Sequence, residues 1–165
     1  MPYIKEVRGK RPHYGKNCFI AENATLVGDI TIGNDCSIWF SVVLRADVDS
    51  IRIGNRVNIQ DGAVLHQSHG SPVILEDDVS IGHLANVHGC TVRKGALIGM
   101  GATVLDGVEV GKGAIIAANA LVTQGTKVGA NEIWAGIPAR CIKKTKPQQA
   151  EEYAKHYMQA KEWYL

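Results

Sequence analysis

An aliphatic residue recurs at every sixth position along most of this chain. The period runs through Ile20, Leu26, Ile32, Ile38 and Leu44, then Ile53, Ile59 and Leu65, then Leu75, Ile81 and Val87, and finally Ile98, Val104, Val110, Ile116, Val122 and Val128. A small or β-branched residue stands four places after many of them, and a glycine often follows directly. An amphipathic helix needs apolar spacings of three and four, so this period predicts short strands joined by turns.

A six-residue unit with two inward positions and a glycine-rich corner suits one short strand plus a turn. Three units close a triangular coil of about eighteen residues, and successive coils stack about 4.8 Å apart. The aliphatic residues then form one internal column that supplies the hydrophobic core. The pattern resembles the hexapeptide-repeat proteins. This resemblance implies a mainly β fold, a left-handed parallel β-helix, although the general rule for parallel crossovers favours the opposite hand.

Three departures from the period predict where the coils are modified. Leu44 and Ile53 are nine residues apart rather than six, so Arg45 to Arg52 carries an insertion. Leu65 and Leu75 are ten apart, which predicts a loop of about four extra residues around Ser68 to Pro72. Val87 and Ile98 are eleven apart rather than twelve, which indicates a one-residue deletion near Arg93.

The repeat ends after Trp134, at the segment Ala135 to Arg140. Pro147 then precedes a predicted helix over Gln148 to Leu165, in which Tyr153, Tyr157 and Ala160 have helical spacing. We expect residues 1–146 to form the β-helix domain and residues 147–165 to form a C-terminal helix packed on its outside, within a single domain overall.

Composition narrows the classes of partner. The chain has 165 residues and a formal net charge of only +2, which gives no indication of nucleic acid or a membrane surface as partner. No apolar run is long enough to cross a bilayer, and no signal-peptide core opens the chain. The four cysteines lie far apart without a CxxC pair, which favours reduced, structural thiols. A cytoplasmic location is expected.

Three of the six histidines form a pattern that is typical of metal ligands. His66 and His88 each take the first outward position of their units. They are 22 residues apart, which is a coil of about eighteen residues plus the loop of about four. They therefore stack on one face, where two imidazoles can share an ion at Zn–N distances of about 2.0–2.1 Å. His83 lies in the preceding unit, on another face or corner, so a second subunit would have to bring it to that ion, which predicts a threefold ring. We expect the remaining three, His13, His69 and His156, to be solvated.

The segments Asn58 to His66 and Ile81 to Cys90 resemble the γ-class carbonic anhydrases, and the similarity covers nearly the whole chain. The resemblance implies a homotrimer with a metal at each subunit interface, held by His66 and His88 of one chain and His83 of the next. It also implies roles for further matched positions: Arg45, Asp47 and Asp61 at the subunit interface, Gln60 as a hydrogen-bond partner of metal-bound water or bicarbonate, and Asn58 beside it.

The residues themselves support these roles but leave a simpler one open. Gln60 is outward one unit before His66, and Arg45 and Asp47 begin the insertion, where they can reach a neighbour. The charged residues could equally serve only to hold subunits together. Three imidazoles leave a tetrahedral ion one open position, and a bound water of pKa about 7 would then hydrate CO2 to bicarbonate. Zinc is the expected metal, with iron or cobalt as alternatives.

One feature departs from the resemblance and three other functions compete with it. The loop Gln67 to Pro72 is short and has no carboxylate, and Val48 follows Asp47, so an acidic proton shuttle is missing; His69 is the available relay. Hexapeptide acyltransferases share the fold and use a histidine as general base. An ester or thioester hydrolase is the second rival, and a protein that binds a metal or metal complex without catalysis is the third.

Overall fold

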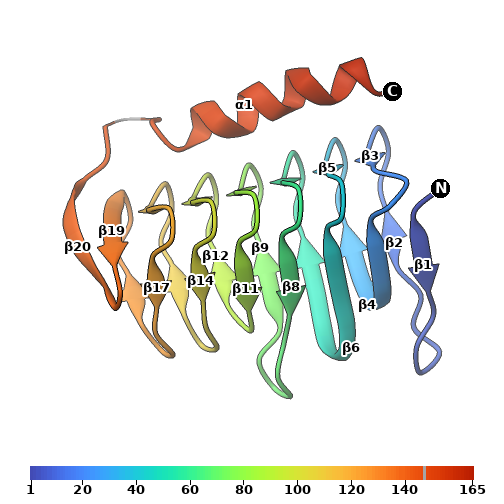
Figure 1. Cartoon of the computed structure of the whole chain (residues 1–165), viewed down its shortest axis with the longest axis horizontal. Coiled ribbons are helices and arrows are strands. Elements are labelled where there is room, and N and C mark those ends of the chain that lie inside the picture. Colours follow the sequence, from blue (N-terminus) through green and yellow to red (C-terminus); the bar gives the residue numbers. More distant parts are fainter. Residues whose placement is uncertain (147) are drawn as a thin grey trace.

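Short parallel strands form the three faces of a β-helix in this computed structural model, which describes residues 1–146 and 148–165 (Figure 1). The strands stack coil upon coil along the long axis of the molecule, so that neighbours in a sheet come from successive coils. The predicted mainly β fold class, a parallel β-helix of hexapeptide repeats, is confirmed.

Each face is one ladder of stacked strands. The first, which we call the histidine face, contains β4 (Thr25–Ile32), β6 (Val43–Ile53), β8 (Val64–His66), β11 (Asn86–His88), β14 (Thr103–Val104) and β17 (Leu121–Val122), with β1 (Tyr3–Lys5) paired to β4. The second contains the far ends of β4 and β6, then β9 (Val73–Leu75), β12 (Thr91–Val92), β15 (Glu109–Val110) and β18 (Lys127–Val128), with β2 (His13–Tyr14) at its edge. The third contains β3 (Phe19–Ile20), β5 (Ser37–Ile38), β7 (Asn58–Ile59), β10 (Ser80–Ile81), β13 (Leu97–Ile98), β16 (Ile115–Ile116), β19 (Glu132–Gly136) and β20 (Ala139–Lys144).

The six-residue period defines the core, as predicted. All its aliphatic positions from Leu26 to Val128 are buried, and Ile20 at the open end is partly buried. The small residues four places later, including the predicted inward Cys36, are buried beside them. All four cysteines are free thiols. Apolar side chains thus stack on their equivalents from neighbouring coils, and the core extends along the whole prism.

Both predicted insertions lie at the corner between the histidine face and the second face. Residues 45–52 lengthen β6 into an eleven-residue strand, which pairs with β8 at one end and with β9 at the other. The second insertion forms the loop between β8 and β9, closed by a bridge between Ser68 and Ser71, and it projects below the coils in Figure 1. The one-residue deletion falls between β11 and β12 rather than near Arg93, because Val87 and Val92 are five residues apart, whereas Val92 and Ile98 keep the spacing of six.

The C-terminal segment differs in part from the prediction. Helix α1 spans Glu151–Ala160 and continues as a 3-10 turn over Lys161–Trp163, so the predicted helix over Gln148 to Leu165 was too long at both ends. Gln148 has a left-handed φ of 60°, which an α-helix cannot accommodate. Pro147 lies outside the described residues. Helix α1 runs along the outside of the coils, above the third face (Figure 1).

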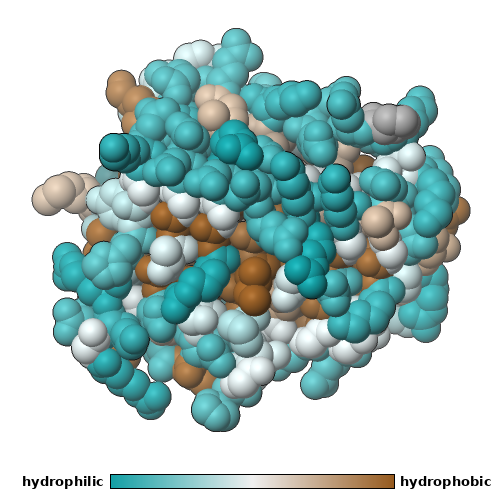
Figure 2. All heavy atoms as spheres, turned by 180° about the vertical axis from the view of Figure 1, so that it is seen from behind, coloured by the Kyte–Doolittle hydropathy of each residue, from teal (hydrophilic) through white to brown (hydrophobic). Residues whose placement is uncertain are grey.

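Aromatic and small side chains attach α1 to the coils. Ala154 and Ala160 are buried, and Tyr157 packs edge-on against Trp39 with ring centroids 5.5 Å apart. Among the described residues, no helix is long and apolar enough to cross a membrane. Seen from behind, the molecule has a band of hydrophobic surface between hydrophilic rims (Figure 2).

Candidate metal centre

His66 and His88 lie one above the other on the histidine face, as their spacing predicts. They are direct partners in the parallel register of β8 and β11. His66 Nδ1 and His88 Nε2 face each other at 3.1 Å. Two nitrogens about 2.0–2.1 Å from one tetrahedral ion are about 3.3 Å apart, so the pair is already close to the separation that a shared ion requires.

The far nitrogen of His88 contacts a carboxylate that the sequence analysis missed. Asp106 Oδ1 lies 2.5 Å from His88 Nδ1, and both side chains are half-buried. Burial raises the pKa of Asp106, but hydrogen bonds from Ser68 and His88 outweigh it and leave that pKa below its ordinary value. Val87 pairs with Val104 in the next coil, so Asp106 lies one residue beyond the position in register with His88. The regular spacing alone would therefore not have found this contact.

The far nitrogen of His66 also contacts a carboxylate. Asp47 Oδ1 lies 3.1 Å from His66 Nε2, and its other oxygen accepts a hydrogen bond of 2.6 Å from Arg45. Burial raises the pKa of Asp47, while hydrogen bonds from Arg45 and His66 lower it further than burial raises it. The lengthened β6 therefore brings Asp47 to the metal ligands and leaves the Arg45 side chain 47% exposed.

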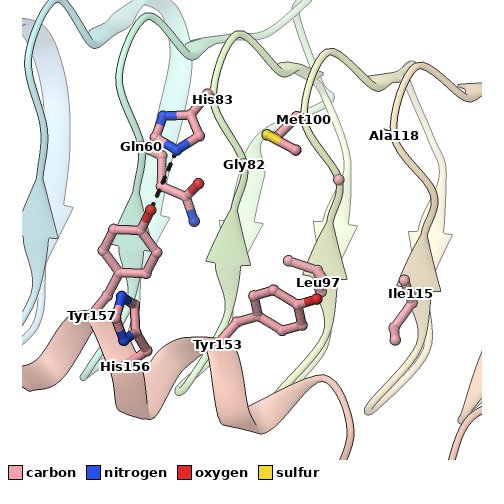
Figure 3. A pocket seen from close by; sticks show the side chains of 11 residues that line it. Gln60, Gly82, His83, Leu97, Met100, Ile115, Ala118, Tyr153, His156 and Tyr157 are labelled. Atoms are coloured by element: carbon pink, nitrogen blue, oxygen red, sulfur yellow. Dashed lines mark hydrogen bonds between the residues drawn. The ribbon is translucent and has the colours of Figure 1, made fainter.

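His83 lies round the corner from the other two histidines. It follows β10 on the third face, where its Nδ1 is 2.9 Å from Asp61 Oδ2 and its Nε2 is 3.3 Å from the Tyr157 hydroxyl of α1 (Figure 3). The part of the chain that the structure describes contains no group of three His, Cys, Asp or Glu able to hold a metal. Within one chain, the three predicted ligands are therefore not brought together.

Gln60 is fixed by a buried polar chain beneath His83. Its amide donates to Asn58 Oδ1 at 2.9 Å, and the Asn58 amide donates to Ser80 Oγ at 2.7 Å. All three side chains are buried. A buried amide with satisfied partners keeps one orientation. Figure 3 shows the Gln60 amide beside His83 and Tyr157.

A cavity of about 400 Å³ opens beside His83, between α1 and the third face. Its polar end is formed by Gln60, His83 and Tyr157, and the rest of its lining is Gly82, Leu97, Gly99, Met100, Ile115, Ala118, Tyr153 and His156 (Figure 3). The sequence placed the helix outside the coils but gave no sign that Tyr157 would meet His83. His156 is exposed, as expected, and also lines this cavity.

A second cavity adjoins the loop on the histidine side. Asp47, Asp49 and His69 line this space of about 360 Å³. Asp49 also holds the loop, because its carboxylate accepts from the backbone N–H of Gly70 and its carbonyl accepts from the buried Gln67 amide. The structure thus supplies carboxylates beside the site from strands, although the loop itself has none.

Known proteins share this repeat and this fold. The model for bacterial transferase hexapeptide (six repeats) matches residues 15–46 and 89–124. A carbonic anhydrase of Geobacillus kaustophilus is 46% identical over 98% of this chain and 90% of its own length. The mitochondrial gamma carbonic anhydrase 1 of Arabidopsis thaliana is 42% identical over 88% of this chain, and the match covers 55% of that protein.

Among solved structures, a Bacillus cereus protein provisionally described as an acetyltransferase superposes with a TM-score of 0.96 at 42% identity, covering 99% of this chain and 96% of that one. The fold and the repeat are thus shared with proteins described as carbonic anhydrases and with proteins described as transferases. The relatives described as carbonic anhydrases align over most of the chain, including the segments that hold the three histidines, and the chain belongs to the γ-carbonic anhydrase family of hexapeptide-repeat proteins.

Proposed function

We propose that this protein is a metal-dependent carbonic anhydrase that hydrates CO2 to bicarbonate at sites shared between the subunits of a homotrimer. The observation that supports it most is the facing pair of imidazole nitrogens at 3.1 Å, each ring having its other nitrogen next to a carboxylate. A histidine that binds a metal typically donates its second N–H in this way.

The donor set fits a divalent transition metal. Imidazole nitrogens suit zinc, iron and cobalt, and three of them leave a fourth position for water. Two of the ligands, His66 and His88, already stand near the required separation. When bound, the metal supplies a water whose pKa falls to about 7 and which can attack CO2 at neutral pH. We take zinc as the first candidate.

The third ligand would come from the neighbouring subunit. His83 is 39% exposed at its corner, and the residues next to it in sequence and in the following coil, Leu84 and Met100, are 69% and 57% exposed. Large exposed apolar side chains gathered round a polar site are typical of a subunit contact. Packing this corner against the histidine face of another chain would bring His83 to His66 and His88 and, repeated twice, would close a ring.

The other side chains would act on substrate and subunit contacts. Gln60, held by Asn58, can donate or accept a hydrogen bond at a fixed point beside His83, which suits orientation of substrate or water. Arg45 and Asp61 are exposed enough to pair across the interface, and Asp47 would hold both Arg45 and His66. A proton could leave through the cavity that Asp49 and His69 line.

Stopped-flow CO2 hydration tests the proposal. Protein reconstituted with zinc, or anaerobically with ferrous iron, is compared with His88→Ala prepared in the same way, with metal content and oligomeric mass recorded for each sample. Hydration that is present in the wild type and lost in the variant supports the assignment. A fully metallated trimer without hydration would exclude the carbonic anhydrase reaction while keeping the metal site.

The cavity beside His83 favours one second candidate, hydrolysis of an ester or thioester. A space of about 400 Å³ is far larger than CO2 needs, and its wall of Leu97, Met100 and Ile115 suits an apolar acyl group. A series of acyl esters of increasing chain length, assayed with wild type and Ile115→Trp, tests this. Turnover that rises with chain length and falls in the variant would support the hydrolase. An acyltransferase, in contrast, would keep its activity after metal removal.

A further inference from the structure

Each of the three histidines has one ring nitrogen next to an aspartate. Asp47 pairs with His66 and Asp61 with His83, and both aspartates precede their histidines in the chain. The third partner, Asp106, comes from the opposite direction, one coil further along in the regular part of the prism.

We propose that Asp106 is the positioning residue for His88: it holds the Nδ1–H of the ring, so that the Nε2 lone pair is directed at His66 and the metal position. The effect on metal binding rests on the proposed function, whereas the effect on the ring itself does not. Asp106 Oδ1 lies within hydrogen-bonding distance of His88 Nδ1, as the other two aspartates do of His66 and His83.

The chain leaves room for this contact at Gly89. This glycine directly follows His88, and a Cβ built on it would collide with Asp106 Oδ1. Its φ of +52° lies in the left-handed region, where a side chain is disfavoured as well. The carboxylate thus occupies the space that a side chain at position 89 would fill, and glycine there is a condition for the pair.

The chemistry follows from the two forms of neutral imidazole. With the proton on Nε2, that nitrogen has no lone pair for a metal. A carboxylate at Nδ1 favours the proton there and leaves Nε2 free to bind. The Asp106 side chain is 23% exposed and its ion-pair partner is an outward-facing histidine, so we expect its loss to change fold stability little.

The first test is metal-free. The protein with 15N-labelled histidine is studied by long-range 1H–15N NMR at about pH 8.5, where ordinary imidazoles are neutral, with His88 assigned through His88→Gln. We expect the Nδ1–H form of His88 in the wild type and mainly the Nε2–H form in Asp106→Ala. The same Nδ1–H form in both proteins would overturn the proposal, whatever the metal affinity.

The second test measures zinc affinity by competition with a chelating dye. Asp106→Ala is expected to weaken zinc binding about 10–100-fold, and Asp106→Asn by less, because its neutral oxygen still accepts a weaker bond. The matched control is Asp78→Asn, which removes a carboxylate of equal exposure (23%) that pairs with Arg56 instead of a histidine; its zinc affinity should match the wild type.

The two tests separate the two ideas. If the wild-type protein binds no zinc but Asp106→Ala changes the His88 form, the metal site proposed above fails and the positioning role holds. If zinc binds and Asp106→Ala leaves both affinity and His88 unchanged, the positioning role fails and the metal site holds. An equal loss of zinc affinity in Asp78→Asn would also count against a specific role for Asp106.

Discussion

The coils from Val43 to Val92 and those from Leu97 to Val128 share the same column of buried aliphatic side chains but differ in the lengths of their strands and loops. In the later coils, two-residue strands repeat with little change. The earlier coils contain an eleven-residue strand and the loop between β8 and β9. All eight predicted site residues lie between positions 45 and 88, in the interrupted coils. The regular repeat supplies a rigid scaffold, and its interruptions bring polar side chains to one corner.

The largest expected effect is a loss of stability when a core side chain is truncated, and it shows whether the core is equally well packed in the interrupted and the regular coils. Leu65→Ala, directly before His66, and Ile116→Ala, in the regular coils, each remove a fully buried side chain. We expect each to lower the free energy of unfolding by about 2–5 kcal/mol, measured by urea denaturation. If Leu65→Ala cost much less than Ile116→Ala, the interrupted coils would be loosely packed and the rigid-scaffold interpretation would be wrong.

The comparison also predicts that outward ligands can be removed without loss of fold. His88→Ala should abolish zinc binding, from one ion per site to nearly none, because only one histidine of the facing pair remains. Its free energy of unfolding, measured without metal, should fall by less than about 1 kcal/mol, since the side chain lies outside the core. Elemental analysis after dialysis gives the metal content, and wild-type zinc in this variant would refute the assignment.

The extended β6 should matter for assembly more than for folding. Arg45 is half-exposed and is bonded to Asp47 within its own chain. If it also pairs across the interface, Arg45→Ala should raise the trimer dissociation constant about tenfold or more, which is about 1.4 kcal/mol or more. Sedimentation velocity across a dilution series measures this, with Arg93→Ala as a control on the second face. If both variants kept the mass of a trimer throughout the dilution series, Arg45 would not contribute to the interface.

The period predicted much of this arrangement, and its limits are physical. The separation of His66 and His88 could be converted to a stacked pair because both lie on strands whose register the core fixes. Asp106 lies one residue past the position in register with His88, because the deletion shortens this coil, so the period alone does not predict their contact. The contact between Tyr157 and His83 depends on how α1 lies across the coils, which a local period does not encode. The third ligand depends on a second chain.

The smallest expected effect lies at the far end of the regular coils, where Glu132 helps to close the prism. Hydrogen bonds from Lys144, Trp134 and the backbone of Gly129 lower the pKa of Glu132 from 4.5 to about 2. Because the folded-state pKa lies below the unfolded one, this carboxylate stabilises the protein above about pH 4.5, and its contribution is lost as the pH falls towards 2.

Glu132→Gln should therefore have a lower urea midpoint than the wild type at neutral pH, and the difference should shrink between pH 4.5 and pH 2. Glu22→Gln, the same substitution at an exposed position near the other end, is the matched control. A difference that stays constant with pH would mean that Glu132 acts through the shape of its side chain rather than its charge. The end of the β-helix would then be stabilised by side-chain packing, as the core is, and charged groups would contribute only at the corner that carries the insertions.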